Sequence, residues 1–251
     1  MAWRARRARL VTSPGAFFWG EVRRPSTPRR YRLADGSGQV LIRHHNHEDS
    51  FILSEIFEGT STYAMPADVR RALGEDVASI VDIGGNIGLA ALWFARAFPG
   101  ARLTIVEADP TNADVLEQTL SLNGLGDRST VIRAAAGAHG GELPFVLGLG
   151  GRSHAATAAD VVTTRVAMID ALSLIAGSDL LKMDIEGGEW AILSDPRLGD
   201  DPPRALCLEY HLWQCPGADP TATVRTLLEQ AGLHIVALRE EGHGGVVWAV
   251  R

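Results

Sequence analysis

The feature that most constrains the fold is a nine-residue run, residues 81–89, in which an apolar strand leads straight into a glycine-rich turn. Ile80 and Val81 are typical of a parallel strand buried on both faces, and residues 89–98 carry apolar side chains at helical spacing. Glycines in the turn tolerate positive φ and leave out Cβ atoms where a ligand must approach the backbone. Asp82 stands at the carboxyl end of the strand, where open α/β sheets bind ligands. The run therefore predicts a strand–turn–helix unit with a binding site at its turn.

The spacing of the glycines distinguishes a turn that binds a dinucleotide from one that binds S-adenosylmethionine. A dinucleotide fingerprint requires glycine at the first, third and sixth positions, but counting from Gly84 this chain has Asn86 and Leu89 there. The turn instead resembles the Asp-x-Gly-x-Asn/Gly-x-Gly motif of class I methyltransferases, which bind S-adenosylmethionine. A second apolar run, residues 103–106, ends in Glu107, about twenty residues beyond the turn, as expected for a carboxylate that accepts both ribose hydroxyls. A glycine-rich connection with a surface glutamate stays the alternative.

A second cluster of polar residues follows another apolar strand, in residues 180–190 (LLKMDIEGGEW). Together with residues 81–88, 107–112 and 169–172, this cluster resembles the FkbM family of methyltransferases, over roughly residues 78–211. That family typically shows a Val-Asp-x-Gly-Ala-Asn-x-Gly turn, a Glu-Pro-x-Pro segment, a Leu-Asp-x-Leu segment and a Lys-x-Asp-x-Glu-Gly-x-Glu strand end. The departures here are Gly85 for the usual alanine, Ala108-Asp109-Pro110 in the acidic-proline segment and Ile169 for the usual leucine. None of them removes a polar group that the chemistry needs.

The resemblance implies S-adenosylmethionine as the cofactor. In such enzymes the acidic residue and the backbone of the turn hold the methionine part, and the carboxylate after the second strand holds the ribose. After the third strand the chain continues with alanines at 134–136, so no acidic side chain stands where many methyltransferases hold the adenine amino group. The residues expected to contact the cofactor are Asp82, Gly84, Gly85, Asn86, Gly88, Glu107, Ala108, Ala135 and Asp184.

Methyl transfer requires a base and a positioning shell, because the sulfonium methyl group is already activated and the acceptor oxygen has only to be aligned and deprotonated. His211 is one candidate base, since an unperturbed imidazole has a pKa near neutral pH. Asp184 is the other, and Glu209 lies at the same expected sheet edge. A carboxylate would need burial or a like-charged neighbour to raise its pKa. A purely structural role beside Tyr210 is the alternative for His211.

Other polar residues near these strand ends have less specific roles. Lys182 is expected to pair with Asp184 or Glu186 and to fix the floor of the cleft. Glu186, Ser153 and His154 are candidates for substrate contacts. Solubility of the glycine-rich loop over residues 148–154 explains Ser153 and His154 equally well.

A magnesium site is a further alternative. Hard carboxylate oxygens suit Mg²⁺, which would acidify a substrate hydroxyl. The residues able to hold it are Asp184, Glu186 and Glu209, with Asn86 or His211. Because the chain lacks a compact metal motif, we expect no metal ligands, and Mg²⁺ is not favoured.

Composition agrees with one catalytic domain and an extension. At 251 residues and 46% hydrophobic, the chain can bury a full core, and its net charge of −6 gives no global attraction to nucleic acid. No apolar run at the start reaches the length of a signal or membrane segment, and the two cysteines, Cys207 and Cys215, favour a reducing cytoplasm. The start is basic, which is typical of a solvated arm or of an arm that meets an acidic substrate, a partner or an anionic membrane. Its arginines are Arg4, Arg6, Arg7, Arg9, Arg23, Arg24, Arg29 and Arg30.

The rest of the chain favours an α/β fold of the Rossmann-like class I methyltransferase type, mostly parallel with an antiparallel last strand. We expect an N-terminal extension over residues 1–75, with a basic arm, a β-hairpin and two lid helices, and an S-adenosylmethionine-binding domain over residues 76–251. The expected elements of the extension are a hairpin of residues 31–33 and 40–42 and helices over 51–57 and 66–73. The expected later elements are strands over 131–133, 143–147, 161–166 and 205–208, a helix over 221–231, and a closing hairpin of 233–238 and 246–250.

The sequence thus predicts an S-adenosylmethionine-dependent O-methyltransferase of the FkbM type, acting on a hydroxyl of a sugar, a polyketide or a related natural product. The resemblance implies the hydroxyl, whereas the residues themselves indicate the cofactor. Amino methylation is disfavoured because the fourth strand ends in residues 184–187 (DIEG) and not in an Asn-Pro-Pro-Tyr type of motif. The alternatives are a noncatalytic cofactor-binding subunit that recruits a partner or RNA, and a nicotinamide-dependent oxidoreductase.

Overall fold

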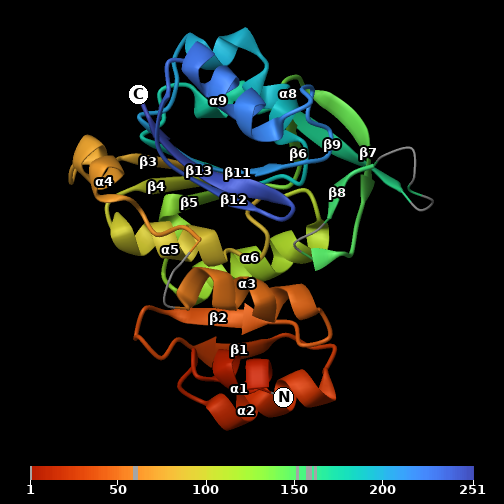
Figure 1. Ribbon diagram of the computed structural model, residues 1–251. Helices are drawn as coiled ribbons and strands as arrows, with labels where there is room; N and C mark the ends of the chain where they lie inside the picture. The colour runs from red at the N-terminus through yellow and green to blue at the C-terminus, as the bar shows by residue number, and fades with distance from the viewer. Residues whose placement is uncertain (1, 59–61, 151–152, 157–159, 161–162) are drawn as a thin grey trace.

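The computed structural model describes residues 2–58, 62–150, 153–156, 160 and 163–251 (Figure 1). The helices are α1 (Ala2–Ala8), α2 (Pro14–Arg23), α3 (His47–Phe57), α4 (Ala67–Leu73), α5 (Leu89–Ala97), α6 (Pro110–Leu122), α7 (Leu172–Ile175), α8 (Glu189–Leu193) and α9 (Pro220–Gln230). The strands are β1 (Arg29–Arg32), β2 (Gln39–Ile42), β3 (Ser79–Ile83), β4 (Arg102–Val106), β5 (Ser129–Ile132), β6 (Ala135–Gly137), β7 (Gly141–Val146), β8 (His154–Ala155), β9 (Thr164–Asp170), β10 (Leu180–Met183), β11 (Ala205–His211), β12 (His234–Glu241) and β13 (Gly244–Val250).

A seven-stranded sheet organises the larger part of the chain, in the order β12-β13-β11-β10-β3-β4-β5. Strands β3, β4, β5, β10 and β11 run parallel, and β13 runs antiparallel to both of its neighbours. The predicted mostly parallel sheet with an antiparallel last strand is confirmed. Strand order reverses between β3 and β10, and such a switch point leaves a crevice at the carboxyl ends of the strands.

Helices cover both faces of this sheet, which explains the uninterrupted apolar strands. Ile80 packs with α5 on one face, whereas Val81 and Ile83 pack with α8 and α9 on the other. Two of the helices begin with a carboxylate cap followed by proline. Asp109 accepts a hydrogen bond from the Thr111 N–H at the start of α6, and Asp219 accepts one from the Ala222 N–H at the start of α9.

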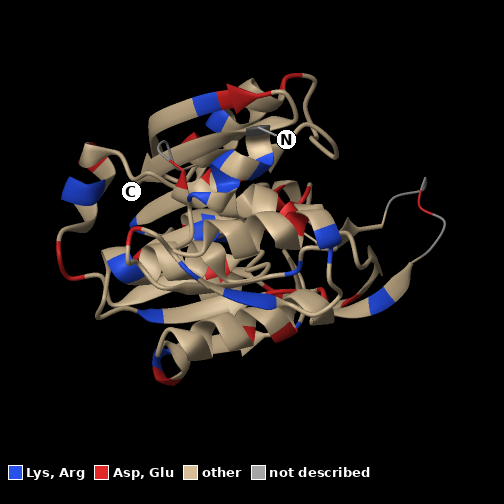
Figure 2. Ribbon diagram, turned by 90° about the horizontal axis from the view of Figure 1, so that it is seen from below, with Lys and Arg blue, Asp and Glu red and all other residues tan. Residues whose placement is uncertain are grey.

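The N-terminal elements stack below α5 and α6 in Figure 1. Strands β1 and β2 pair antiparallel, which confirms the predicted hairpin. The Asn123 side chain accepts a hydrogen bond from the Gln39 N–H and donates one to the Gln39 carbonyl, so β2 is tied to the end of α6. Basic segments gather beside the N-terminus (Figure 2). Since one apolar core runs from Phe17 through Leu53 to Phe94, the boundary between residues 75 and 76 stays a proposal.

A second, four-stranded sheet has the order β6-β9-β7-β8. Strand β7 agrees with the strand expected over residues 143–147 to within two residues. The strand expected over residues 161–166 is β9 and begins at Thr164, while residues 161–162 lie outside the described part of the chain. The sequence does not predict strands β6 and β8. The three residues of β6 are Ala-Ala-Gly and β8 has only two residues, so neither shows hydrophobic alternation.

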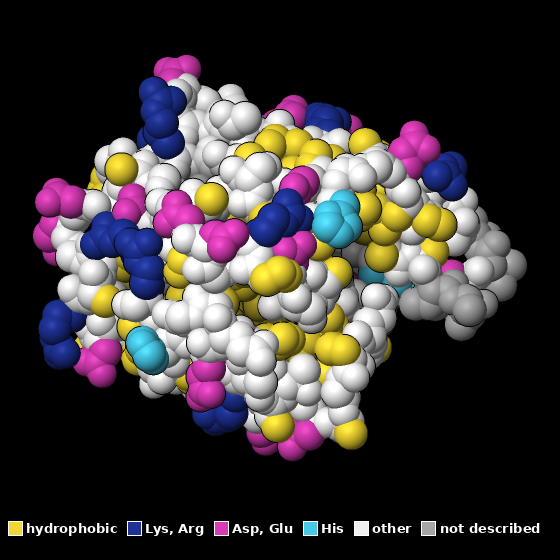
Figure 3. Space-filling view, turned by 90° about the horizontal axis from the view of Figure 1, so that it is seen from above, with side chains coloured by type: hydrophobic (Ala, Val, Ile, Leu, Met, Phe, Trp, Pro, Cys, Tyr) yellow, Lys and Arg dark blue, Asp and Glu magenta, His cyan; other side chains and the backbone are white. Residues whose placement is uncertain are grey.

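The C-terminal elements follow the predicted order. Strand β11 extends three residues beyond its expected end at Leu208, so that Glu209 and His211 belong to the strand itself. Above the sheet, acidic and basic side chains are interspersed with small apolar areas (Figure 3). None of the helices in the described ranges is both long and apolar enough to cross a bilayer.

Candidate functional site

A cavity of about 500 Å³ lies where β3, β4, β10 and β11 end. This volume is within the range of small-molecule pockets. Helix α3 contributes Phe51, Ile52 and Glu55 to its wall, whereas no described residue of α4 lines it. The expectation of two lid helices is therefore corrected to α3 alone, because α4 packs against β11 and β13 instead. The predicted site residues on the wall are Gly84, Gly85, Asn86, Glu107, Ala108, Ala135, Ser153, Asp184, Glu186, Glu209 and His211.

The glycine turn is pinned between the ends of two neighbouring strands. The Gly84 N–H donates to the Val106 carbonyl at 3.0 Å, and the Asn86 N–H donates to Glu107 Oε2 at 2.7 Å. Gly84 has φ +85°, and a Cβ at this position would overlap the carbonyl oxygen of Asp184. The turn therefore presents its backbone to the cavity at a fixed distance from β4 and β10.

The other two glycines of the turn serve packing. A Cβ on Gly85 would overlap Ile105 and come within 2.7 Å of Leu116 Cδ1, which explains why alanine does not occupy this position. Gly88 adopts φ +85° at the start of α5 and is absent from the cavity wall. Gly88 thus shapes the turn where α5 begins, and its contact with the cofactor stays a prediction.

Glu107 is the predicted ribose carboxylate, and it is buried at the end of β4. Its Oε1 accepts hydrogen bonds from the Asp109 N–H at 2.8 Å and from Asn112 Nδ2 at 3.4 Å. Burial raises the pKa of Glu107 to about 6, although the N–H donors of Asp109 and Asn86 oppose the rise. These bonds fix the carboxylate on the wall, where it can accept further hydrogen bonds from a ligand.

Asp82 and Lys182 form a buried ion pair beneath the turn. They are register partners on β3 and β10, their side chains are 0% and 3% exposed, and Nζ lies 3.1 Å from Oδ1. Lys182 also donates to the Gly84 carbonyl at 2.6 Å, and Asp82 outweighs burial and raises the pKa of Lys182. One expectation is corrected here, because Lys182 pairs with Asp82 and not with Asp184 or Glu186. Asp82 lies off the cavity wall, and its contact with the cofactor stays a prediction.

One half of the cavity is apolar. Alanines at 134–136 line it together with Leu143 and Phe145 of β7, and Ala108 follows Glu107 on the same wall. These lining residues carry no acidic side chain, and the adenine contact at Ala135 stays a prediction. This half can accept a flat ring by packing and by hydrogen bonds with the backbone.

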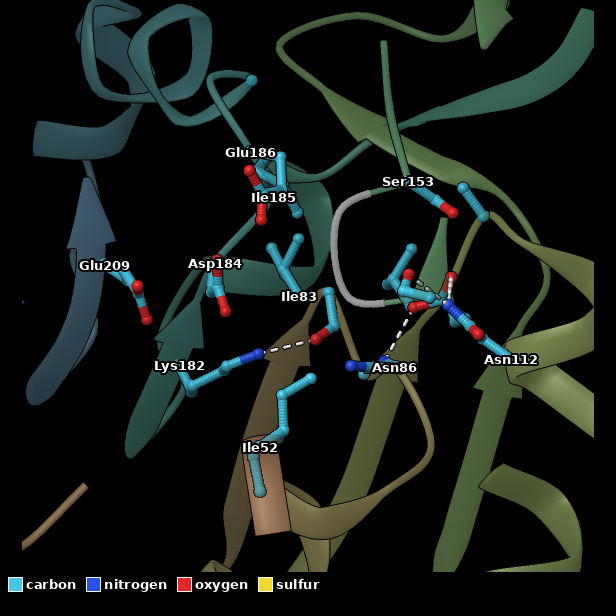
Figure 4. Close-up of a pocket in the computed structure, with 18 of the residues that line it drawn as sticks. Ile52, Ile83, Asn86, Asn112, Ser153, Lys182, Asp184, Ile185, Glu186 and Glu209 are labelled. Atoms are coloured by element: carbon cyan, nitrogen blue, oxygen red, sulfur yellow. Dashed lines mark hydrogen bonds between the residues drawn. The ribbon is translucent and has the colours of Figure 1, made fainter. Parts of the chain in front are cut away.

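The other half of the cavity is acidic. Figure 4 shows Asp184, Glu186 and Glu209 converging from β10 and β11 toward the same space. Burial and the charge of Asp184 raise the pKa of Glu186 to about 7 and also raise that of Glu209. Burial and the charge of Glu209 raise the pKa of Glu55, across the cavity on α3, to about 7. A positively charged group placed here would be favoured, because it would offset the crowding of these carboxylates.

His211 lies at the edge of the acidic half and is 2% exposed. Its Nδ1 lies 3.2 Å from Glu189 Oε1, and its Nε2 lies 3.5 Å from Glu186 Oε2. Burial alone would lower its pKa, but the hydrogen bond with Glu189 and the charges of Asp184, Glu189 and Glu186 outweigh burial and raise the pKa to about 9. The raised pKa favours the protonated imidazole at neutral pH. Sequence reasoning missed the roles of Glu189 and Glu55, since neither directly follows a predicted strand.

The two candidates from the glycine-rich loop have other partners. Ser153 Oγ donates to Asp109 Oδ2 at 2.9 Å and accepts from the Leu149 N–H at 3.2 Å. Its hydroxyl thus connects the glycine-rich loop to the start of α6. His154 lies 3.5 Å from Asp160 and is absent from the cavity wall. Ser153 lies on the wall with its hydroxyl bonded to Asp109, and the expected substrate contacts of Ser153 and His154 stay predictions.

Two groups of side chains have the composition of metal ligands. Ligand atoms of Asp184, Glu186 and His211 lie within 4.8 Å of one another, and those of Glu209, Glu241 and His243 do so as well. Carboxylates this close together can also be accommodated without a metal ion. The raised pKa values of Glu186 and Glu209 favour protonation, and an organic cation could offset the remaining negative charge.

Comparison with known proteins adds three findings. The model of the methyltransferase FkbM domain family matches residues 82–235, which is more than half of the chain. The curated methyltransferase sdnD of Sordaria araneosa is 35% identical over 66 residues, and the match spans 26% of each chain. The solved structure of methyltransferase FkbM from Methylobacillus flagellatus KT has a TM-score of 0.50 and 18% identity, with 69% of this chain and 44% of that chain covered. The chain thus spans less than half the length of either protein, and the solved structure shows a shared fold.

Proposed function

The chain belongs to the FkbM methyltransferase family, and from this premise we propose that it transfers a methyl group from S-adenosylmethionine to a hydroxyl of a sugar, a polyketide or a related natural product. The observation that carries the proposal is the division of one cavity into a nucleoside-type half, with the glycine turn and Glu107, and an acidic half with His211. The first half suits the cofactor and the second suits a proton-transfer step.

In this proposal the ribose hydroxyls donate to Glu107, and adenine packs on the apolar wall at residues 134–136. The turn backbone at Gly84 and Asn86 holds the methionine part, supported from below by Lys182. Asp184 and its acidic neighbours on the wall would hold the positive charge of the sulfonium. Opposite charges attract more strongly in such a partly buried site than in water.

His211 or Asp184 would take the proton of the acceptor hydroxyl. S-adenosylmethionine would supply the methyl group, whose bond to sulfur breaks as its bond to the acceptor oxygen forms, so that neutral S-adenosylhomocysteine leaves. Binding a sulfonium near Asp184 and Glu186 lowers the pKa of His211, because the added positive charge disfavours the imidazolium. The base therefore becomes competent once the cofactor is in place. S-adenosylhomocysteine, whose sulfur is neutral, lacks this effect.

Methyl transfer from labelled S-adenosylmethionine to a panel of hydroxylated sugars and polyketides tests the proposal. His211→Asn and Asp184→Asn should each lower turnover, with His234→Asn as a matched control on the exposed start of β12. Wild-type turnover in both site variants would refute the base assignment. Transfer to nitrogen acceptors alone would refute the hydroxyl, and insensitivity to a chelator is expected because the sulfonium methyl needs no metal for its activation.

A further inference from the structure

Glu189, at the first position of α8, has both carboxylate oxygens occupied by neighbouring backbone. Oε1 accepts the His211 N–H at 2.7 Å, and Oε2 accepts the Gly187 N–H at 2.9 Å. The side chain is 0% exposed and lies behind the cavity wall, so it contacts neither the cavity nor a ligand within it.

We propose that Glu189 is a positioning residue that fixes the tautomer of His211 and directs its Nε2 toward the acceptor. This inference rests on the proposed function, in which His211 takes the acceptor proton. Glu189 Oε1 lies 3.2 Å from Nδ1, and an oxygen that accepts hydrogen bonds requires the hydrogen to be on Nδ1. In the neutral imidazole the lone pair is then on Nε2, on the side of Glu186 and the cavity.

The surrounding residues prevent the imidazole from turning. The Trp213 ring lies 4.5 Å from the ring of His211, and the Trp190 Nε1–H donates to the carbonyls of both His211 and Trp213. A ring flip would place a carbon where Nδ1 now meets Glu189 and would leave a buried carboxylate oxygen without this partner. Glu189 and the Trp213 ring therefore hold the imidazole in one orientation, while Trp190 fixes the backbone that carries both rings.

Several charged groups face His211 and enter its titration. Asp184 and Glu186 follow β10, Glu209 shares β11, and His243 lies with its ring 6.1 Å away at the turn between β12 and β13. Of these and Glu189, Glu189 alone forms a hydrogen bond with the ring. The carboxylates in the cavity therefore change how readily His211 is protonated, whereas Glu189 determines which nitrogen carries the proton.

Nitrogen NMR of protein labelled with ¹⁵N-histidine tests this, with His211→Asn used to assign the resonance. In the wild type at a pH above its titration, His211 should carry its proton on Nδ1. Glu189→Gln should lower the pKa of His211 and shift the population toward the Nε2–H tautomer. Glu241→Gln, the same chemical change at the same sheet edge without contact to His211, should leave the tautomer unchanged.

Turnover adds a second readout with any acceptor that the methyl-transfer panel identifies. Glu189→Gln should lower kcat on the order of 10- to 100-fold and shift the acidic limb of the pH profile to lower pH, while affinity for S-adenosylhomocysteine stays within about twofold. An Nε2–H tautomer in the wild type would overturn the proposal even if the variant does not fold, and so would an unshifted profile in a folded variant. Loss of cofactor binding by the wild type would instead refute the proposed function.

Discussion

The buried pair of Asp82 and Lys182 makes the sharpest prediction about stability. Lys182→Met keeps the length of the apolar stem but removes the ammonium group, so the 0%-exposed carboxylate loses its 3.1 Å partner and the Gly84 carbonyl loses its donor. Removing one member of a buried ion pair costs about 3–5 kcal/mol. With an m-value of roughly 2 kcal/mol per M for urea, the unfolding midpoint should fall by about 2 M.

The matched control is Arg165→Met, which breaks the pair of Arg165 with Glu142 on exposed β-strand surface at 3.0 Å. An exposed pair is worth less than about 1 kcal/mol, so its midpoint should barely change. Adding Asp82→Asn to Lys182→Met should restore part of the loss, since no buried charge then lacks a partner. The reasoning is refuted if Lys182→Met costs no more than the surface control at an unchanged m-value.

Three further predictions concern the site. Glu107→Gln should weaken S-adenosylhomocysteine binding about 10- to 100-fold, because hydrogen bonds to a charged acceptor contribute about 1.5–3 kcal/mol. Calorimetric titration measures this change, and an unchanged affinity would contradict the ribose role of Glu107. Gly84→Ala should abolish binding and lower the melting temperature, because its Cβ overlaps the Asp184 carbonyl and φ is +85°; a wild-type melting curve would contradict this. Folding raises the pKa of His211 to about 9 and that of Glu186 to about 7, so the folded state binds more protons than the unfolded state. The free energy of unfolding of the cofactor-free protein should therefore fall as pH rises from about 5 to 9. An increase of this free energy with pH in urea titrations would contradict these shifts.

The sequence predicts the strand–turn–helix unit well because glycine spacing and apolar periodicity are local properties. The positions of Glu107 and of the acidic strand ends also follow, since parallel strands bring their carboxyl ends to one edge. Gly85 illustrates the limit of a local pattern. Only the packing of Ile105 and Leu116 shows that this glycine fills a space too small for a Cβ.

Side-chain partners across strands could not be predicted in the same way. Asp82 and Lys182 become neighbours because β10 lies next to β3 in register, a relation between segments about a hundred residues apart. The partners of Ser153 and His154 depend equally on distant or loop contacts. The raised pKa of His211 needs the hydrogen bond with Glu189 on α8 and the charges of Asp184 and Glu186 after β10, which together outweigh burial and which no spacing rule supplies.

Calorimetric titration of the folded protein with S-adenosylmethionine and S-adenosylhomocysteine tests the central claim most directly. The account predicts that both bind at one site per chain, that Glu107→Gln weakens both, and that only the sulfonium form lowers the pKa of His211 when the titration is followed by NMR. Absence of binding by folded protein would contradict the claim, and the glycine turn would then have to be structural or serve another ligand.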